Sequence, residues 1–319
     1  MKVCVVGGGG CFGLDTTQYF LNRGHEVLGV GRNPPKSPPF SLNIQSPRYK
    51  YRALHIGYEL DLLMELLDEE RPEVIVNYAA LAEVPLSWKY PEKYYETNVT
   101  AHVKWAKELS KRTWLRKFIH VSTSELYGSN DHPVTEDAPI RCSSPYAVSK
   151  AAFDLHLMTI KDLDWSIIRP SNAYCPGQLL HRVIPRAVVS GLFNQKMPLH
   201  GGGHVRKSYL HATDVSKGID TLINAPSGVY NCGADEPTKI RDVVSEVAGR
   251  FGKPLEEFCE ITEGRKNEDA CFWIDSTKLK SLGWRPSINL SVGISTMIEW
   301  GLKYKSELAN ESPAYLMRA

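Results

Sequence analysis

A glycine-rich turn between an apolar run and a helical pattern is the feature that most restricts the fold of this chain. The apolar run Val3–Val6 leads directly into Gly7-x-x-Gly10-x-x-Gly13, and a helical pattern follows over Leu14–Arg23. In this strand–turn–helix context, glycines let the backbone turn tightly and approach a pyrophosphate, whose charge the helix N-terminus stabilises. The pattern therefore predicts a first βα unit that binds a dinucleotide.

Short apolar runs alternate with helical patterns through the first half of the chain. Strands are expected at Val3–Val6, Val27–Val30, Tyr49–Ile56, Val74–Val76, Phe118–Ser122 and Ser166–Ile168, and helices at Leu14–Arg23, Leu60–Leu67, Tyr94–Leu109 and Tyr146–Ile160. This alternation is typical of a doubly wound parallel sheet. We therefore expect a Rossmann-type α/β domain over residues 1–172, with a returning segment near 207–230. A smaller α+β substrate lobe is expected over residues 173–319.

Composition excludes several classes of protein. The 319 residues carry 38 Lys+Arg against 36 Asp+Glu, and 42% of them are hydrophobic, which is ordinary for a globular chain. A net charge of +2 argues against a nucleic-acid partner. The seven cysteines are scattered without a C-x-x-C pair, so neither a disulfide framework nor a metal site is expected. No apolar stretch approaches a membrane span. We expect a cytoplasmic protein.

Two short segments carry groups suited to acid–base chemistry. Tyr146 and Lys150 are four residues apart at the start of a predicted helix, so they share one face. An ammonium group close to a phenol stabilises the phenolate and lowers its pKa, which makes Tyr146 a candidate base. Thr123 and Glu125 follow the strand at Phe118–Ser122, and they point to the same side if the extended backbone continues.

Together these motifs, in this order, resemble the extended short-chain dehydrogenases/reductases, the family of nucleotide-sugar epimerases and dehydratases. The resemblance covers nearly the whole chain. It rests on the glycine loop, Asn77-Tyr78-Ala79-Ala80, Ser122–Gly128, Tyr146 with Lys150, Arg169–Tyr174, Tyr230-Asn231, Gly264-Arg265 and Leu282-Gly283-Trp284.

The resemblance implies a role for each motif. The cofactor is expected to contact Gly7, Gly10, Cys11, Phe12, Gly13, Arg32, Ala79, Ala80 and Lys150. The nucleotide sugar is expected to contact Ser87, Asn172, Arg206, Lys207 and Arg265. The expected catalytic residues are Thr123, Ser124, Glu125, Tyr146 and Lys150. Relatives pair through two long helices, so a homodimer is expected through residues 92–111 and 146–161.

The end of the second strand bears on the choice of cofactor. An acidic residue there usually holds the ribose 2′-hydroxyl, but this chain has Gly31-Arg32-Asn33. A guanidinium group suits a 2′-phosphate, so we expect NADP, with NAD as the alternative. His55 also stands where the family commonly has an aspartate after the third strand.

The stretch Ser122–Gly128 narrows the reaction, because it most resembles that of GDP-mannose 4,6-dehydratases. The resemblance implies oxidation at C4, removal of the C5 proton by Glu125, loss of water from C6 and return of hydride to C6. A 4-epimerase, which needs no C5 base, is one alternative. Another is a UDP-uronic acid decarboxylase, for which Arg182 and Arg186 are available cations. A cofactor-sensing protein without catalysis is disfavoured by the Tyr146/Lys150 pair.

Overall fold

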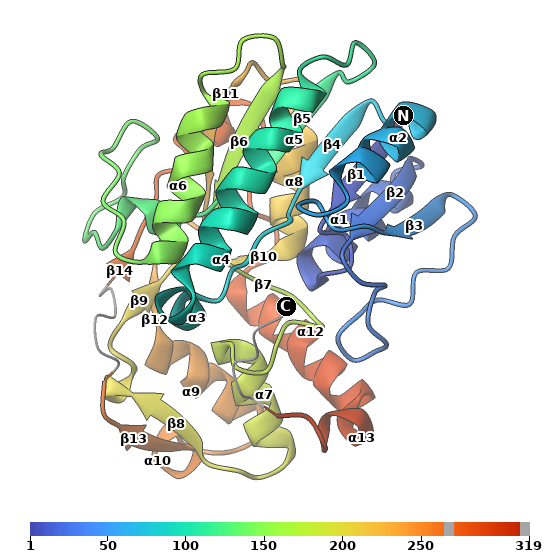
Figure 1. Cartoon of the computed structure of the whole chain (residues 1–319). Helices are drawn as coiled ribbons and strands as arrows, with labels where there is room; N and C mark the ends of the chain where they lie inside the picture. The colour runs from blue at the N-terminus through green and yellow to red at the C-terminus, as the bar shows by residue number, and fades with distance from the viewer. Residues whose placement is uncertain (265–270, 313–319) are drawn as a thin grey trace.

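The computed structural model describes residues 1–264 and 271–312. Seven parallel strands form one sheet in the order β11-β6-β5-β4-β1-β2-β3, which confirms the predicted Rossmann-type, doubly wound α/β fold (Figure 1). The strands are β1 (Lys2–Val6), β2 (Glu26–Gly31), β3 (Tyr49–Ala53), β4 (Val74–Asn77), β5 (Lys117–Val121), β6 (Trp165–Pro170) and β11 (Gly228–Cys232). The order reverses between β1 and β4, and ligands bind at such a switch point in open α/β sheets.

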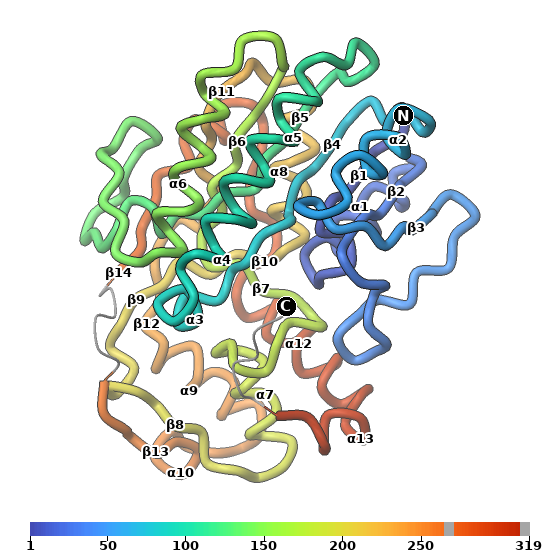
Figure 2. Tube along the Cα trace, viewed as in Figure 1, coloured from blue at the N-terminus to red at the C-terminus, as the bar shows by residue number. Residues whose placement is uncertain are grey.

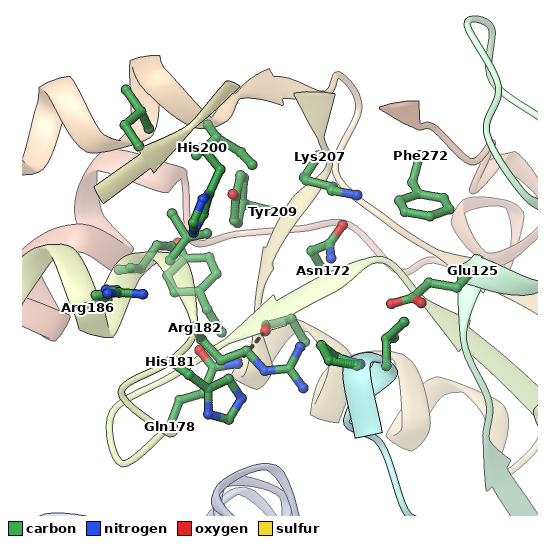
Figure 3. A pocket seen from close by; sticks show the side chains of 18 of the residues that line it. Glu125, Asn172, Gln178, His181, Arg182, Arg186, His200, Lys207, Tyr209 and Phe272 are labelled. Atoms are coloured by element: carbon green, nitrogen blue, oxygen red, sulfur yellow. Dashed lines mark hydrogen bonds between the residues drawn. The ribbon is translucent and has the colours of Figure 1, made fainter. Parts of the chain in front are cut away.

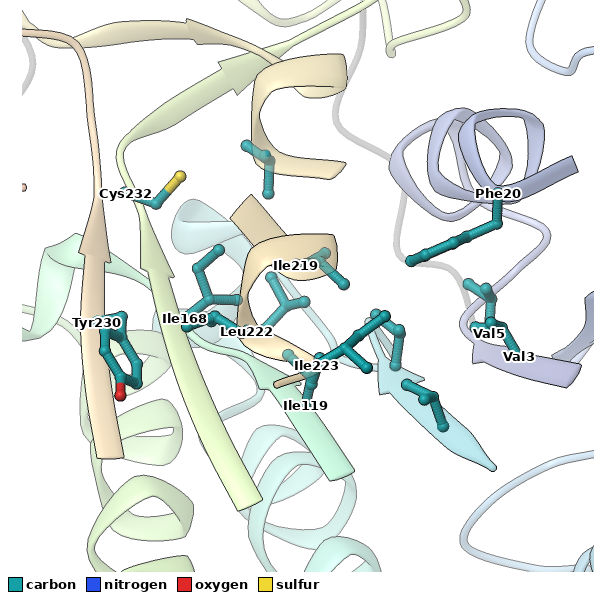
Figure 4. Close-up of a cluster of buried hydrophobic side chains, with 14 of the residues drawn as sticks. Val3, Val5, Phe20, Ile119, Ile168, Ile219, Leu222, Ile223, Tyr230 and Cys232 are labelled. Carbon is teal, nitrogen blue, oxygen red and sulfur yellow. The ribbon is translucent and has the colours of Figure 1, made fainter. Parts of the chain in front are cut away.

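Helices cover both faces of the sheet, which explains why its central strands are continuous apolar runs. On one face, α1 (Cys11–Asn22) and α8 (Ala212–Leu222) pack on β1, β5 and β6, as Figure 4 shows for Phe20 and Ile219. On the other face lie α2 (Leu60–Glu70), α5 (His102–Leu109) and α6 (Pro145–Leu157). None of the described helices combines the length and apolar character needed to cross a membrane.

The helix predicted over Tyr94–Leu109 is interrupted by a wider turn. It consists of α4 (Pro91–Tyr95), the π-helical segment η1 (Glu96–Ala101) and α5. Inside η1, the buried Asn98 side chain accepts a 2.8 Å hydrogen bond from the Leu81 amide and donates one of 2.9 Å to the Leu81 carbonyl oxygen. This pair of bonds fixes the loop that follows β4, close to the switch point.

A second group of elements has its own buried core, centred on α7, α9 and α12. Figure 2 shows it below the sheet as drawn. Its members are β7 (Asn172–Tyr174), α7 (Val183–Leu192), β8 (Met197–His200), β9 (Arg206–Lys207), β10 (Tyr209–His211), β12 (Thr238–Lys239), α9 (Ile240–Arg250), α10 (Leu255–Phe258), β13 (Cys259–Thr262), β14 (Cys271–Phe272) and α12 (Leu290–Lys303). Between β10 and β12, the chain returns to the large sheet through α8 and β11.

The proline-rich segment after β2 is a loop, as predicted, and it reaches the second group. The Trp300 indole nitrogen on α12 donates a 2.8 Å hydrogen bond to the Pro39 carbonyl oxygen. Phe40 packs against the core of α7, α9 and α12. This loop, which connects β2 to the edge strand β3, therefore ties the edge of the sheet to the second group, whose α12 is more than 200 residues away in sequence.

Candidate active site

The glycine loop connects β1 to the N-terminus of α1 beside the switch point. Gly7 has a φ of +83°, and a Cβ placed on it would lie 2.7 Å from the Ala79 amide nitrogen. A Cβ on Gly13 would lie 2.5 Å from the Gly7 carbonyl oxygen. Gly10 is the N-cap of α1 and has no side chain to bind the amides of the first turn. The loop and helix end therefore fit the pyrophosphate of a dinucleotide.

Two basic side chains lie near each other beyond the carboxyl ends of β2 and β3. Burial lowers the pKa of His55, and the positive charge of Arg32 lowers it further. The Tyr51 hydroxyl donates a 2.6 Å hydrogen bond to the Asn33 carbonyl oxygen, which fixes the chain just after Arg32. This corner of the sheet therefore presents positive charge to a ligand.

The first turn of α6 holds Tyr146 in a buried position. Ser144 is the N-cap, and its Oγ accepts a 3.1 Å hydrogen bond from the Ala147 amide. Pro145 occupies the first helical position, where a missing N–H costs nothing. Tyr146 is 8% exposed, and its ring packs edge-on against that of Tyr94, with the two ring centres 6.4 Å apart. Local sequence thus sets the direction of this phenol.

Thr123 and Glu125 both approach Tyr146, although the extended backbone that would have placed them on one side does not continue between them. The extended conformation ends at Thr123, and residues Ser124–Tyr127 form the 3₁₀ turn η2. Burial raises the pKa of Tyr146, the charge of Glu125 raises it further, and a hydrogen bond with Thr123 opposes both. The expectation that Lys150 lowers this pKa is therefore wrong for the chain by itself.

The direction of the Lys150 side chain explains that result. Its Nζ donates a 2.9 Å hydrogen bond to the Val121 carbonyl oxygen and lies 3.1 Å from Nε2 of His120. Burial lowers the pKa of Lys150 to about 8, against a smaller opposing effect of Asp154. The ammonium group is thus held against the end of β5 rather than against the phenol.

A buried ion pair lies beneath these groups and ties α6 to β6. Asp154 accepts a 3.0 Å hydrogen bond from Nε of Arg169 and one of 2.9 Å from the Ser122 hydroxyl. Arg169 also donates 2.7 Å to the Tyr127 hydroxyl, which in turn donates 2.9 Å to Oδ1 of Asn231. The network thus joins the carboxyl ends of β5, β6 and β11. Because removal of one partner would leave an uncompensated buried charge, the ion pair is expected to hold these strand ends in place.

A cavity of about 530 Å³ lies between the sheet and the second group of elements. Glu125 lines it from the sheet side, and Asn172 and Lys207 line it from the second group (Figure 3). The Asn172 Oδ1 is buried and has no hydrogen-bond partner in the structure, so it offers an acceptor to a ligand. The wall also contains Val84, Pro85, Trp88, Ser143, Ser144, Ala173, Tyr174, Gln178, His181, Arg182, Val183, Ile184, Arg186, Met197, Pro198, Leu199, His200, Tyr209, Ile240 and Phe272.

At one end of the cavity, a carboxylate balances basic groups from the second group of elements. Oε2 of Glu83 lies 2.7 Å from Nε2 of His181, and both Glu83 oxygens lie 3.3 Å from the Arg182 guanidinium. Burial favours the neutral acid, but the His181 hydrogen bond and the Arg182 charge hold the pKa of Glu83 below its usual value. Arg182 is thus already paired within the chain.

Several residues with an expected role in binding or catalysis are not part of the cavity wall. Thr123, Tyr146 and Lys150 are buried and are among them. Ser87 is buried, and its hydroxyl donates a 2.7 Å hydrogen bond to the Val84 carbonyl oxygen. Ser124 is also buried and does not line the cavity. Arg206 alternates with Lys207 on β9, so only Lys207 faces the cavity. Arg265 lies outside the described residues.

The cofactor candidates Cys11, Phe12 and Ala80 are half-buried near the glycine loop and the loop after β4. Sequence reasoning did not identify Tyr209, His181 or Phe272 as part of the site. These side chains come from elements of the second group whose sequence carries no motif. The one signal in the sequence was that these residues follow β6, in the part of the chain expected to form the substrate lobe.

The fold and this site define an extended short-chain dehydrogenase/reductase. Residues 4–297 match the family described as GDP-mannose 4,6 dehydratase, and the chain belongs to that family. A dTDP-glucose 4,6-dehydratase of Streptomyces griseus is 31% identical over 73% of this chain and 72% of its own.

An Arabidopsis thaliana trifunctional UDP-glucose 4,6-dehydratase/epimerase/reductase is 28% identical over 82% of this chain. The match spans 40% of that longer protein. Among solved structures, the dTDP-glucose 4,6-dehydratase of Bacillus anthracis in complex with NAD has a TM-score of 0.86 and 27% identity, over 96% of this chain and 98% of its own. A Thermotoga maritima UDP-glucose 4-epimerase with UDP-glucose has a TM-score of 0.87 at 22% identity, over 96% and 100%, which shows a shared fold alone.

Proposed function

We propose that this protein is a nucleotide-sugar 4,6-dehydratase that uses a tightly bound nicotinamide dinucleotide. The observation that carries the proposal is the position of Glu125, which lines the cavity and acts electrostatically on Tyr146. A phenol and a carboxylate at one sugar provide separate bases for O4 and C5. The dehydratase relatives support the same reaction.

A nicotinamide held beside the glycine loop would supply the acceptor for the hydride from C4 and the donor that returns it to C6. Tyr146 removes the proton from the C4 hydroxyl, with Thr123 orienting the phenol. The C4 ketone acidifies the C5 hydrogen, which Glu125 then removes. Because Ser124 is buried away from the cavity, Glu125 also delivers that proton to the C6 hydroxyl, which leaves as water. When hydride returns to C6, C5 regains a proton. This gain balances the proton that Tyr146 removed from the C4 hydroxyl, so the net loss from the sugar is one molecule of water.

We propose NADP as the cofactor, with NAD as the alternative. Arg32 and His55 lie close together where the 2′-position of the adenosine ribose is expected, and the Arg32 guanidinium suits a 2′-phosphate. The Bacillus anthracis relative with NAD supports the alternative. Equilibrium binding of NADP and NAD to the wild type and Arg32→Ala tests this choice. An unchanged ratio of the two affinities would exclude a role for Arg32.

The nucleotide sugar is proposed to lie in the 530 Å³ cavity, with its diphosphate near Lys207 and a polar group at Asn172. The second group of elements then acts as the substrate lobe, over residues 173–319 apart from the returning segment. The decarboxylase alternative needs a cation for a substrate carboxylate. Of its two candidates, Arg182 is already paired with Glu83, whereas Arg186 lines the cavity and keeps this alternative open. The shared fold keeps 4-epimerisation as the second candidate.

Product masses from a panel of GDP-, UDP-, CDP- and dTDP-sugars separate the reactions. Loss of one water indicates dehydration, loss of carbon dioxide indicates decarboxylation, and no change of mass indicates epimerisation. Glu125→Gln is expected to stop water loss while reduced cofactor still accumulates transiently. Glu136→Gln is the matched control, because Glu136 accepts a hydrogen bond from the Asn231 amide outside the cavity. Unchanged turnover in Glu125→Gln would favour the epimerase.

We further propose a cytoplasmic homodimer. The apolar side chains Val148 and Leu155 on α6 and Met158 at its C-cap are each more than 40% exposed, and Tyr95 on α4 is 39% exposed. Such a patch beside two adjacent helices suits a helix-to-helix interface. Light scattering of the wild type and Leu155→Glu tests the dimer. None of the seven cysteines, all of which lie within the described residues, forms a disulfide bond, which is consistent with the proposed reducing compartment.

A further inference from the structure

The buried ring of His120 on β5 contacts Lys150, yet the proposed reaction gives it no role. It is 1% exposed, and each of its two nitrogens faces a polar side chain. Nδ1 lies 3.0 Å from Nδ2 of Asn77, and Nε2 lies 3.1 Å from Nζ of Lys150. His120 therefore connects the end of β4 to the lysine on α6.

The hydrogen bonds of Asn77 determine which nitrogen of His120 carries the proton. Oδ1 of Asn77 accepts a 3.0 Å hydrogen bond from the Ala79 amide, so the group facing His120 is the NH₂, which only donates. Nδ1 of His120 must then accept. A neutral imidazole has one proton, so that proton is placed on Nε2.

This placement directs an N–H group at Lys150. A lysine ammonium has three donors and no acceptor, so a charged Lys150 and the Nε2–H of His120 are two donors facing each other at 3.1 Å. A neutral amine resolves the conflict, because it accepts from His120 and still donates to the Val121 carbonyl oxygen at 2.9 Å.

The other charged or titratable groups around His120 leave this conflict in place. Asp154 on α6 has its Oδ1 3.8 Å from Nε2 of His120, and its charge is shared with Arg169 from β6. His102 on α5 meets the His120 ring edge-on at 5.8 Å, and burial lowers its pKa to about 4, so it is neutral. Because Asp154 and Arg169 neutralise each other and His102 is neutral, a charged Lys150 would leave this buried cluster with a net positive charge.

We propose that His120 is a positioning residue that couples the charge of Lys150 to the tautomer of its own ring. The neutral amine pairs with the proton on Nε2, and the ammonium pairs with the proton on Nδ1. Moving the proton to Nδ1 breaks the hydrogen bond from Asn77, so the coupling disfavours the ammonium. In the proposed reaction Lys150 acts as the ammonium when dinucleotide and substrate are bound, so His120 limits the fraction of the enzyme that is in the active charge state. This rests on the proposed function only for the role of Lys150.

Nitrogen-15 NMR of histidine-labelled wild-type protein tests the coupling without turnover. The His120 signals, assigned by their loss in His120→Gln, are expected to change from the Nδ1–H to the Nε2–H tautomer as the pH rises through the pKa of Lys150. A single tautomer from pH 6 to pH 10 would overturn the proposal. Failure of the protein to convert any nucleotide sugar would contradict the proposed function but leave this result standing.

The pH dependence of kcat/KM provides the second measurement. Gln at position 120 can turn its amide oxygen toward an ammonium, so the basic limb of His120→Gln is expected to move up by about one pH unit. His102→Leu is the matched control, because it removes a buried imidazole that packs on His120 but whose hydrogen bond is made to the Thr97 carbonyl oxygen, and the basic limb of this variant is expected to stay in place. If the basic limb of the kcat/KM profile does not move in His120→Gln, or moves by the same amount in His102→Leu, then His120 has only a packing role.

Discussion

The ammonium group of Lys207 lies 4.0 Å from the centre of the Phe272 ring, and both side chains line the cavity. The ring holds the cation at the wall where a diphosphate is proposed to bind. Lys207→Met is expected to raise KM about 10- to 100-fold with little change in kcat, because a hydrogen bond to a charged group contributes about 1.5–3 kcal/mol. Steady-state kinetics check this, with Arg206→Met as the control on the other side of β9. A loss confined to kcat would contradict the assignment.

Gly13 allows α1 to pack directly against the glycine loop. A Cβ there would meet the backbone of Gly7 and Gly8 at 2.5 and 2.8 Å, so Gly13→Ala must displace the loop. Affinity for the dinucleotide is expected to fall at least tenfold, as titration calorimetry can measure. Gly249→Ala is the control, because its Cβ would meet nothing within 4 Å inside α9. That variant is expected to gain about 0.5–1 kcal/mol of stability. Equal cofactor affinity in both variants would refute the packing argument.

Acid is expected to destabilise the protein through its buried histidines. Burial lowers the pKa of His102 to about 4 from an ordinary 6.5, so between these values the unfolded chain binds a proton that the native chain does not. The free energy of unfolding therefore falls as the pH drops from 6.5 toward 4, by about 3 kcal/mol for this residue. Urea unfolding at several pH values should show a flatter dependence in His102→Leu. Parallel curves would rule out the effect.

Lys150 is expected to act in the opposite pH range. Its native pKa of about 8 lies below the ordinary 10.5, so between these values the unfolded chain again binds more protons. Stability from this residue therefore rises with pH over that interval. The free energy of unfolding of Lys150→Met, relative to the wild type, should be most favourable below pH 8 and decline by about 3 kcal/mol by pH 10.5. A difference that does not vary with pH would contradict the burial of this amine.

The sheet was predictable because its strands are buried on both faces. Val74–Asn77 and Lys117–Val121 are covered entirely by helices, and their apolar runs reveal this directly. The π-helical turn at Glu96–Ala101 was not predicted, because it depends on the contact of Asn98 with Leu81, 17 residues away. Periodicity within one helix contains no information about that contact.

Site residues could be predicted where a motif fixes the local backbone. They could not be predicted where tertiary packing determines whether a side chain points into the cavity. Tyr146 follows from its capped helix start, whereas the buried hydroxyl of Ser87 and the outward face of Arg206 depend on how the loop and β9 pack. The raised pKa of Tyr146 was also unpredictable, since it reflects burial and the charge of Glu125. Spacing alone could not show that Lys150 points to His120.

The last strand of the sheet, β11, comes from residues 228–232, after the chain has built much of the second group of elements. On the ribosome, β6 therefore has an open edge until more than two thirds of the polypeptide has been made. The dinucleotide-binding half cannot finish folding first, as an N-terminal domain usually does. Nascent chains that stop before β11 are expected to expose that edge to chaperones and to one another.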